Sequence, residues 1–358
     1  MENNDNLENE FNKVRNSIFY FDWNIYSYLS NLSALSPDME KTKYCFSIIL
    51  DSFIDLSKTC IPYSVFHYRD IILGDESFFD DKIKTLLKYT NGWNVKEYPD
   101  NKELLQYNKS SDMLTEFNHY RTNAEFSDKP LSNLKQLLEI LMHKPLENDV
   151  FADIRDKLIK IISDDNEPAG LSILKFNKVM RNANLKVNNA KIQYPVVSHE
   201  QYNNTPDIQG LVEKTLKESD IDFSLVMKQF DSFKILSSSI VSNFTSEIMR
   251  LSFICDFIGL SNEKLSKKTS FEAQINDLSH LSLALRMPFF VTEDKTLAMK
   301  ANFIKKWMKL PVKIFNMDSF ITTVLSQVYK EDLMKGNLIF KFMDNNELVK
   351  EYSLQKSS

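Results

Sequence analysis

Two short apolar runs, each followed closely by an acidic residue, constrain the fold of this chain more than any other feature. Residues 18–21 lead directly to Asp22, and residues 289–292 are followed two positions later by Asp294. Such runs are typical of strands buried on both faces of a parallel sheet. Open α/β sheets bind ligands at the carboxyl ends of their strands, so we expect both acids at a functional edge.

A helix that presents an acid is expected just before the second run. Thr269 and Glu272 are three residues apart, which is the spacing of a capping box. The helix that follows carries Asp277, with His280 one turn further along. Residues three and four apart are neighbours on a helix, so these two side chains are expected to lie close together.

The early part of the chain repeats the pattern of a strand followed by polar groups. Asn24 is placed to orient the carboxylate of the preceding acid by hydrogen bonding. Residues 59–63 are predicted to form another strand, after which Ser64 caps a helix. That helix carries His67 and Asp70 three residues apart, so both are expected on one side of it.

Helical periodicity dominates the middle of the chain, where we predict an insertion into the α/β frame. Residues 224–257 contain no Pro or Gly and are predicted to form one long helix. Two strands are expected in the tail, at residues 338–342 and 348–354. The predicted organisation is a disordered N-terminus at 1–15, the two parts of the α/β domain at 16–96 and 245–320, the α-helical insertion at 97–244, and a C-terminal extension at 321–358.

A run of lysines follows the second acid. Residues 296–310 are predicted to form a helix, residues 311–315 a last central strand, and no acid interrupts the chain from Lys295 to Lys313. The default interpretation is a solvated helix face. The competing interpretation is an edge that contacts phosphates, with Lys295 and Lys300 as the substrate-binding candidates.

Composition limits the classes of protein to which the chain can belong. A net charge of −5 argues against a general nucleic-acid coat protein, although an acidic active site adds negative charge of its own. The three cysteines have no paired metal spacing, and the six glycines form no phosphate-binding loop. No apolar run approaches the roughly 20 residues of a membrane span or forms a signal peptide, so we expect a cytoplasmic protein with no membrane contact.

The acids predict a metal site if the fold brings them together. Several carboxylates in one place cannot all stay ionised without a cation. Oxygen-only sites suit Mg²⁺ or Mn²⁺ better than Zn²⁺, and such an ion can activate water for attack on a phosphodiester. The alternative interpretation of each acid is a helix cap or a solvated loop charge. The acids concerned are Asp22, Asp70, Asp277 and Asp294.

In this order, the motifs resemble those of the PIN-domain nucleases, over about residues 16–80 and 268–320. The four motifs that carry the resemblance are Asp22-x-Asn24, Tyr63-Ser64-x-x-His67-x-x-Asp70, Asp277-x-x-His280-x-x-x-Ala284 and Val291-Thr292-x-Asp294. The resemblance implies an α/β fold, a PIN-like three-layer α/β/α sandwich with a central parallel sheet, which the predicted helical insertion would interrupt.

The resemblance also implies an endoribonuclease that depends on Mg²⁺ or Mn²⁺ and acts on single-stranded RNA. Asp22, Asp277 and Asp294 would hold the metal, and Asp70 would be the fourth catalytic acid. Asn24 and Thr292 would support the site. For His67 and His280 a structural role is the default, and a contact with Asp70 or Asp277 from behind the site is the functional alternative.

Many relatives in that family act as toxins or in bacterial defence, so such a role is the biological expectation. A protein partner or antidote and a homo-oligomer are further expectations. The alternative to a nuclease is a catalytically degenerate PIN-like protein that binds RNA or a protein through its helical insertion. A phosphatase that uses Asp22 as nucleophile ranks last, because Asn24 occupies the place of the second aspartate which that chemistry needs.

Overall fold

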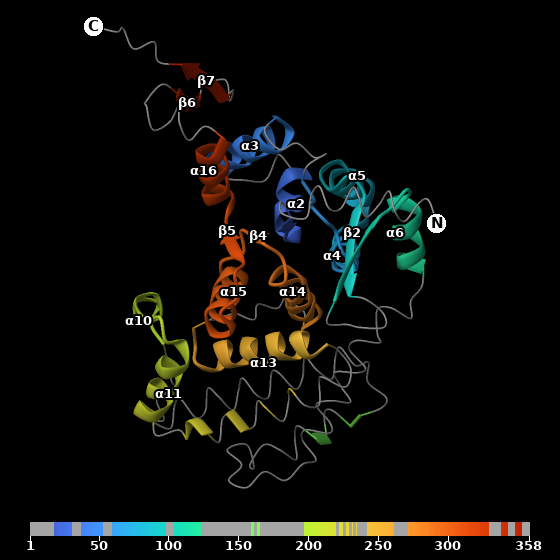
Figure 1. The fold of residues 1–358 in the computed structure, drawn as a ribbon. Coiled ribbons are helices and arrows are strands. Elements are labelled where there is room, and N and C mark those ends of the chain that lie inside the picture. Colours follow the sequence, from blue (N-terminus) through green and yellow to red (C-terminus); the bar gives the residue numbers. More distant parts are fainter. Residues whose placement is uncertain are drawn as a thin grey trace, which may run out of the picture.

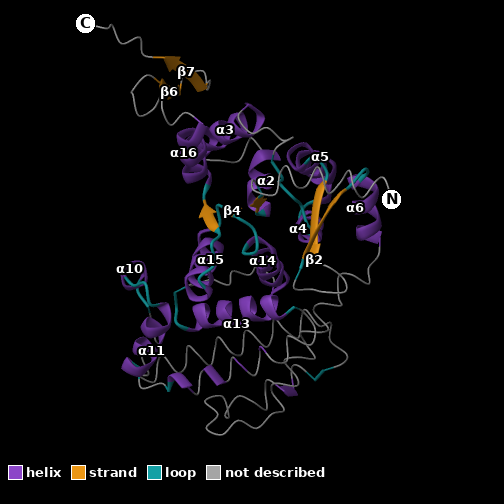
Figure 2. Cartoon of the chain, in the orientation of Figure 1, coloured by secondary structure: helices purple, strands orange, loops and turns teal. Residues whose placement is uncertain are grey.

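The structure is a computed structural model whose described part is a mixture of helices and strands, with helix predominating (Figure 2). The described residues are 18–30, 37–52, 59–97, 104–122, 159–160, 163–164, 197–219, 222–224, 227–228, 231, 234, 242–260, 271–328, 338–342 and 348–352. Their helices are α2 (Trp23–Ser30), α3 (Pro37–Ser52), α4 (Val65–Ile72), the short 3-10 helix η1 (Glu76–Phe78), α5 (Phe79–Thr90), α6 (Met113–Thr122), α10 (His199–Asn204), α11 (Ile208–Glu218), α13 (Asn243–Phe257), α14 (Phe271–Ala284), α15 (Lys295–Met308) and α16 (Met317–Val328).

A parallel sheet of three short strands lies at the centre of this structure. Its strands are β1 (Phe19–Phe21), β4 (Phe289–Val291) and β5 (Lys313–Phe315), in the order β1-β4-β5. Both pairs are parallel, and their register aligns Tyr20, Phe290 and Ile314 in one row. The three central strands expected from the apolar runs are therefore confirmed.

Helices cover both faces of this sheet (Figure 1). Because side chains alternate along a strand, the row that contains Tyr20 and Phe290 packs into one hydrophobic cluster with α13, α14 and α15. The alternate row, with Phe21 and Val291, packs into a second cluster with α2, α3 and α16. The α/β class is thus confirmed for the described residues, in a mostly helical structure with a small parallel sheet. The PIN-like sandwich stays an expectation.

The segment predicted as a strand at residues 59–63 is extended but makes only isolated bridges. Cys60 bridges Ile18 beside the sheet, and Tyr63 bridges Asn94. Asn94 belongs to β2 (Trp93–Glu97), which pairs antiparallel with β3 (Leu105–Lys109). The boundary predicted at residue 97 therefore falls at the end of a strand, and another strand follows it. Residues 123–158 and 165–196, which hold much of the predicted insertion, lie outside the described residues.

The prediction of one helix over residues 224–257 is wrong. Ser242 has an extended backbone, with φ −61° and ψ 156°, and its hydroxyl oxygen accepts a bond from Thr245 N. A serine in this conformation is an N-cap, so α13 begins afresh at Asn243. Apolar spacing runs on across the cap, which explains why the periodicity did not reveal the break.

The tail contains the expected pair of strands. β6 (Leu338–Phe342) and β7 (Leu348–Tyr352) pair antiparallel. The first residues of the chain, including the predicted disordered segment 1–15, lie outside the described part. None of the described helices combines the length and the apolar character needed to cross a lipid bilayer.

Candidate functional site

The carboxyl edge of the parallel sheet carries the first group of predicted site residues. Asp22 N donates to Val291 O at 2.9 Å, and Thr292 N donates to Phe315 O at 2.9 Å. These bonds extend the parallel ladder by one residue beyond each strand. Asp22 and Thr292 therefore lie side by side at this edge, although 270 positions separate them in the chain.

The Thr292 hydroxyl joins the polar groups of this edge. It donates to Asp22 Oδ2 at 2.8 Å and accepts from Asn24 Nδ2 at 3.2 Å and from Asp294 N at 3.1 Å. A hydroxyl has one hydrogen to donate and two lone pairs, so all of its capacity is used. Asn24 Oδ1 in turn accepts from Glu293 N at 3.2 Å. Both residues predicted to support the site thus lie where they can orient Asp22.

Asp22 is buried, with 4% of its surface exposed, and its carboxylate is unusually basic. Burial raises its pKa to about 6, and the nearby Asp70 carboxylate adds to the rise. His280 and the bonds from Thr292 and Trp23 N oppose this increase but do not cancel it. The folded protein therefore holds a negative charge at this edge at a cost in free energy.

Asp294 caps the helix that leaves the edge. Its Oδ1 accepts from Thr296 N at 2.8 Å and from Leu297 N at 2.9 Å, and its side chain is exposed. A carboxylate at this position also interacts favourably with the positive end of the helix dipole. The cap interpretation of Asp294 is therefore correct, and the same residue lies at the carboxyl edge of the sheet.

A further acid, Glu293, lies beside these two. Burial raises the pKa of Tyr28, and the carboxylates of Glu293, Asp294 and Asp22 raise it further. Burial also raises the pKa of Glu293 itself, whose Oε1 accepts from Met317 N at 2.5 Å. Glu293 was not among the site residues predicted from the sequence, although it immediately precedes Asp294.

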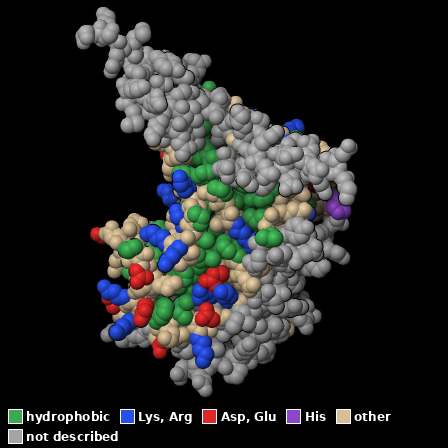
Figure 3. Space-filling model, viewed as in Figure 1, with side chains coloured by type: hydrophobic (Ala, Val, Ile, Leu, Met, Phe, Trp, Pro, Cys, Tyr) green, Lys and Arg blue, Asp and Glu red, His purple; other side chains and the backbone are tan. Residues whose placement is uncertain are grey.

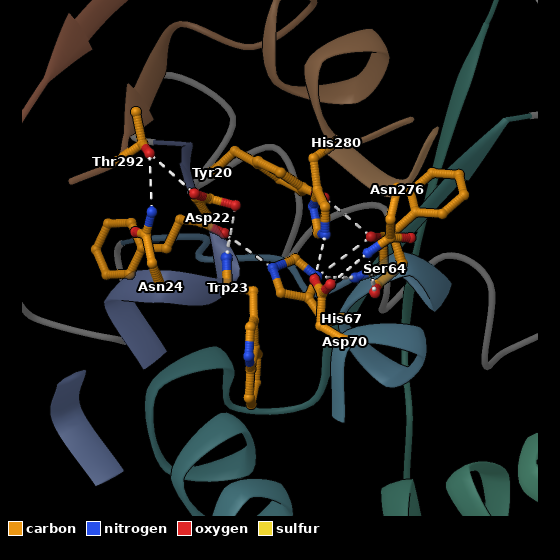
Figure 4. A network of polar contacts seen from close by, with 12 residues as sticks. Tyr20, Asp22, Trp23, Asn24, Ser64, His67, Asp70, Asn276, His280 and Thr292 are labelled. Carbon is orange, nitrogen blue, oxygen red and sulfur yellow. Dashed lines mark hydrogen bonds and ion pairs between the residues drawn. The ribbon is translucent and has the colours of Figure 1, made fainter. Parts of the chain in front are cut away.

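A second polar network lies behind the edge and centres on Asp70 (Figure 4). Asp70 Oδ2 lies 2.8 Å from His280 Nε2, and Oδ1 accepts from Asn276 Nδ2 at 2.6 Å. Asn276 Nδ2 also donates to Phe66 O at 3.1 Å. His280 thus contacts Asp70, one of the two partners considered for it. Asn276 and His280 are four residues apart on α14, whereas Asp277 is half-buried between them.

The network continues through the core to the strand that precedes the edge. The Tyr20 hydroxyl lies 2.7 Å from His280 Nδ1 and 2.9 Å from Ser64 Oγ. His67 Nδ1 accepts from Ser64 N at 2.9 Å, so Nε2 carries the proton and donates to Phe21 O at 2.8 Å. Burial lowers the pKa of His67, which keeps it neutral. His67 therefore has the structural contacts expected by default, whereas the contact of His280 with Asp70 is the one considered as its functional alternative.

The two lysines predicted to bind substrate lie in different environments. Lys295 is exposed at the start of α15, directly after Asp294. Lys300 has only 7% of its side chain exposed, and its ammonium lies 3.1 Å from Asp256 Oδ2 of α13. It serves helix packing and does not offer its charge to a ligand at the edge.

The residues predicted to bind a metal are only partly brought together. Among the described residues, no three His, Cys, Asp or Glu side chains gather closely enough to hold a metal ion. The set Asp22, Asp277 and Asp294 does not form such a group there. Asp22 and Asp294, which both contact Thr292, still match the one or two carboxylates through which proteins often bind Mg²⁺, with water completing its shell.

Comparison of the chain with protein-family models, with curated proteins and with solved structures finds no match.

Proposed function

We propose that the carboxyl edge binds Mg²⁺ or Mn²⁺ through Asp22 and Asp294, and that the protein uses this site to hydrolyse RNA phosphodiester bonds. The observation that carries the proposal is the Asp22 carboxylate, buried at this edge with its pKa raised to about 6. Asp294, whose backbone N donates to the same Thr292 hydroxyl that bonds Asp22, brings a second carboxylate to this edge. A divalent cation offsets the repulsion and desolvation of such a group of acids.

The residues around these acids hold them in a fixed geometry. The Thr292 hydroxyl fixes one oxygen of Asp22, and Trp23 N fixes the other at 2.8 Å. Two amides of α15 fix Oδ1 of Asp294. When bound, a divalent ion supplies a water of lowered pKa and neutralises charge on a phosphate. Rigid ligands favour this chemistry because the site needs little reorganisation as charge develops.

The experiment is cleavage of a mixed single-stranded RNA pool by the purified protein in Mn²⁺ and in EDTA. Asp22→Asn and Asp294→Asn are each expected to reduce cleavage to the EDTA background, because both remove a charge that the cation needs. Asp207→Asn is the matched control. Asp207 caps α11 in the same way, through a bond of 3.0 Å from Gly210 N, but belongs to another helix.

The proposal fails if the protein cuts equally well in EDTA, or if Asp294→Asn retains the activity of the Asp207→Asn control. Melting temperatures of all three variants are measured with and without Mn²⁺. A shift produced by Mn²⁺ in the wild-type protein and in Asp207→Asn, but not in the two site variants, separates loss of metal binding from loss of folding.

One observation favours a second candidate, a protein that binds RNA or a partner without cutting. Both oxygens of Asp70 are occupied, by His280 and by Asn276, so the fourth predicted catalytic acid has a structural partner on each side. A degenerate site predicts binding that neither EDTA nor Asp22→Asn changes. RNA binding without metal-dependent cleavage would favour this candidate.

A further inference from the structure

The outer face of α15 carries a stripe of basic side chains. An α-helix turns by roughly 100° per residue, so positions 7 and 11 after Lys295 return to nearly the same side. They are Asn302 and Lys306, and Lys309 follows as the left-handed residue that ends the helix. Leu297 lies on the opposite side of the helix and is buried in the core. The stripe is therefore the solvent side of an amphipathic helix, and its charges are all of one sign.

The stripe continues into β5 without an acidic residue. No Asp or Glu occurs from Lys295 to Lys313, and both of these lysines and Lys309 are exposed. Among the described residues, no acid lies within ion-pair distance of Lys305, Lys309 or Lys313. An ordinary solvated helix face mixes both signs of charge, so this one has an unusual excess of positive charge.

Aromatic rings lie among these lysines. Lys306 Nζ lies 4.1 Å from the centre of the Tyr202 ring and donates to Tyr202 O at 3.1 Å. Lys313 Nζ lies 5.9 Å from the centre of the Phe289 ring. Trp307 is partly exposed on the same helix. In the space-filling view, Lys and Arg side chains lie beside hydrophobic ones over α15 and β5 (Figure 3).

We infer that this surface binds the sugar-phosphate backbone of single-stranded RNA, an inference that rests on the proposed function. The basic ridge is defined as Lys295, Lys305, Lys306, Lys309 and Lys313. Lysines contact phosphates as point charges, and the ridge begins beside the acids proposed to cut RNA, so an RNA strand is its occupant in preference to an acidic protein or a lipid surface. The ridge begins at Lys295, next to Asp294. A strand bound along its length of about 21 Å therefore reaches the carboxyl edge.

The test is binding of a labelled single-stranded RNA oligonucleotide to the full chain in EDTA, at several salt concentrations. Lys295→Gln, Lys305→Gln and Lys309→Gln are combined in one variant. Each phosphate contact contributes roughly 0.7 to the slope of log affinity against log salt for a single strand, so the slope should become shallower by about 2. Lys84→Gln, Lys96→Gln and Lys109→Gln form the control, which changes the net charge equally on α5 and the β2-β3 hairpin.

An unchanged slope in the ridge variant, or an equal change in the control variant, would overturn the inference. So would wild-type binding to anionic phospholipid vesicles in place of RNA. The outcomes also separate this inference from the proposed function. If RNA binding depends on the ridge but no metal-dependent cleavage occurs, the ridge is supported and the proposed nuclease activity is wrong. If the protein cleaves RNA but binding does not depend on the ridge, the nuclease activity is supported and the inference about the ridge is wrong. Melting curves of both triple variants control for folding.

Discussion

Two polar clusters of this protein are built from the same kinds of residue, yet they differ in how deeply each buries its acid. The edge cluster contains Asp22, Thr292 and Asp294, and the inner network contains Asp70 and His280. Each joins segments more than 200 positions apart in the chain. Both Asp22 and Asp70 have a hydrogen-bond partner on each carboxylate oxygen. Asp22 is the more deeply buried of the two acids, and burial raises its pKa to about 6 in spite of these partners.

On the proposed function, the inner network serves to hold the fold together and the edge serves to bind a ligand. The partners of Asp70 fix the relative positions of α4, β1 and α14, although the buried Oδ1 of Asn276 in the same network has no hydrogen-bond partner among the described residues. A cluster that retains unfavourable charge costs stability, and natural proteins accept such costs mainly at functional sites. The comparison therefore predicts opposite responses to substitution in the two clusters.

The largest effect is expected from His280→Ala in the inner network. The change removes a hydrogen-bond partner of both Asp70 and the Tyr20 hydroxyl, and it leaves a cavity in the core. The lost bonds and the cavity together cost about 3–5 kcal/mol of unfolding free energy, and Asp70, with 16% of its side chain exposed, favours the lower end. Urea denaturation measures the loss.

An exposed histidine supplies the control for this prediction. His119→Ala on α6 should change the unfolding free energy by less than about 0.5 kcal/mol, because surface substitutions rarely do more. If both variants lose an equally small amount of unfolding free energy, the inner network does not stabilise the fold, and the predicted contrast between the two clusters is wrong.

The next largest effect is the pH dependence of Asp22. Its pKa is about 6 in the folded protein, against 3.8 for an unperturbed carboxyl, so the folded state holds its proton more tightly than the unfolded state does. Its contribution to stability is therefore fully present below pH 3.8 and is lost as pH rises through 6. The total is roughly 3 kcal/mol.

Asp22→Asn isolates this contribution. Unfolding free energies of the wild-type protein and the variant are compared from pH 4 to pH 7 in EDTA, a range that covers most of the change. The unfolding free energy of the variant should increase relative to that of the wild-type protein as pH rises, and Mn²⁺ at pH 7 should stabilise the wild-type protein only. Parallel curves would show that the pKa of Asp22 lies below this pH range and that burial at the edge does not raise it.

The edge was predictable from the sequence because its signals are local. A short apolar run specifies a buried strand, and parallel strands bring their carboxyl ends to one side of a sheet. Asp22 therefore lies beside Thr292 as expected, and Asn24 and Asp294 each donate a hydrogen bond to the same threonine. The surroundings of Lys300 were not predictable, because helical phase turns this lysine inward to Asp256 although it belongs to a basic run in the sequence.

The inner network was not predictable in the same way because its partners come from distant segments. Asp70 and His280 are 210 positions apart, and neither Asn276 nor Tyr20 differs in sequence context from an ordinary helix or strand residue. Tyr20 occupies an apolar run, so its hydroxyl carried no signal. Strand β3 was missed for a related reason: its polar sequence, Leu-Gln-Tyr-Asn-Lys, lacks the apolar run that reveals a central strand.

A smaller effect is expected from Tyr20→Phe, which keeps the ring but removes the hydroxyl between His280 and Ser64. Both lose a partner in a buried environment, so the unfolding free energy should fall by about 1–2 kcal/mol. RNA cleavage should persist, because the ring and the backbone of β1 stay in place. Loss of cleavage at full stability would instead make the inner network part of the active site.

The smallest effect on stability is expected from Asp294→Asn, although its effect on cleavage is expected to be complete. Asparagine caps helices about as well as aspartate, so the unfolding free energy should change by less than about 0.5 kcal/mol. Asp294→Ala should cost about 1 kcal/mol because the bonds to Thr296 N and Leu297 N are lost. The same two substitutions at Asp207 should give the same pair of stability values with cleavage intact. If Asp294→Asn proves stable and fully active, the residue is a helix cap and nothing more, and the edge loses the second of its two proposed ligands.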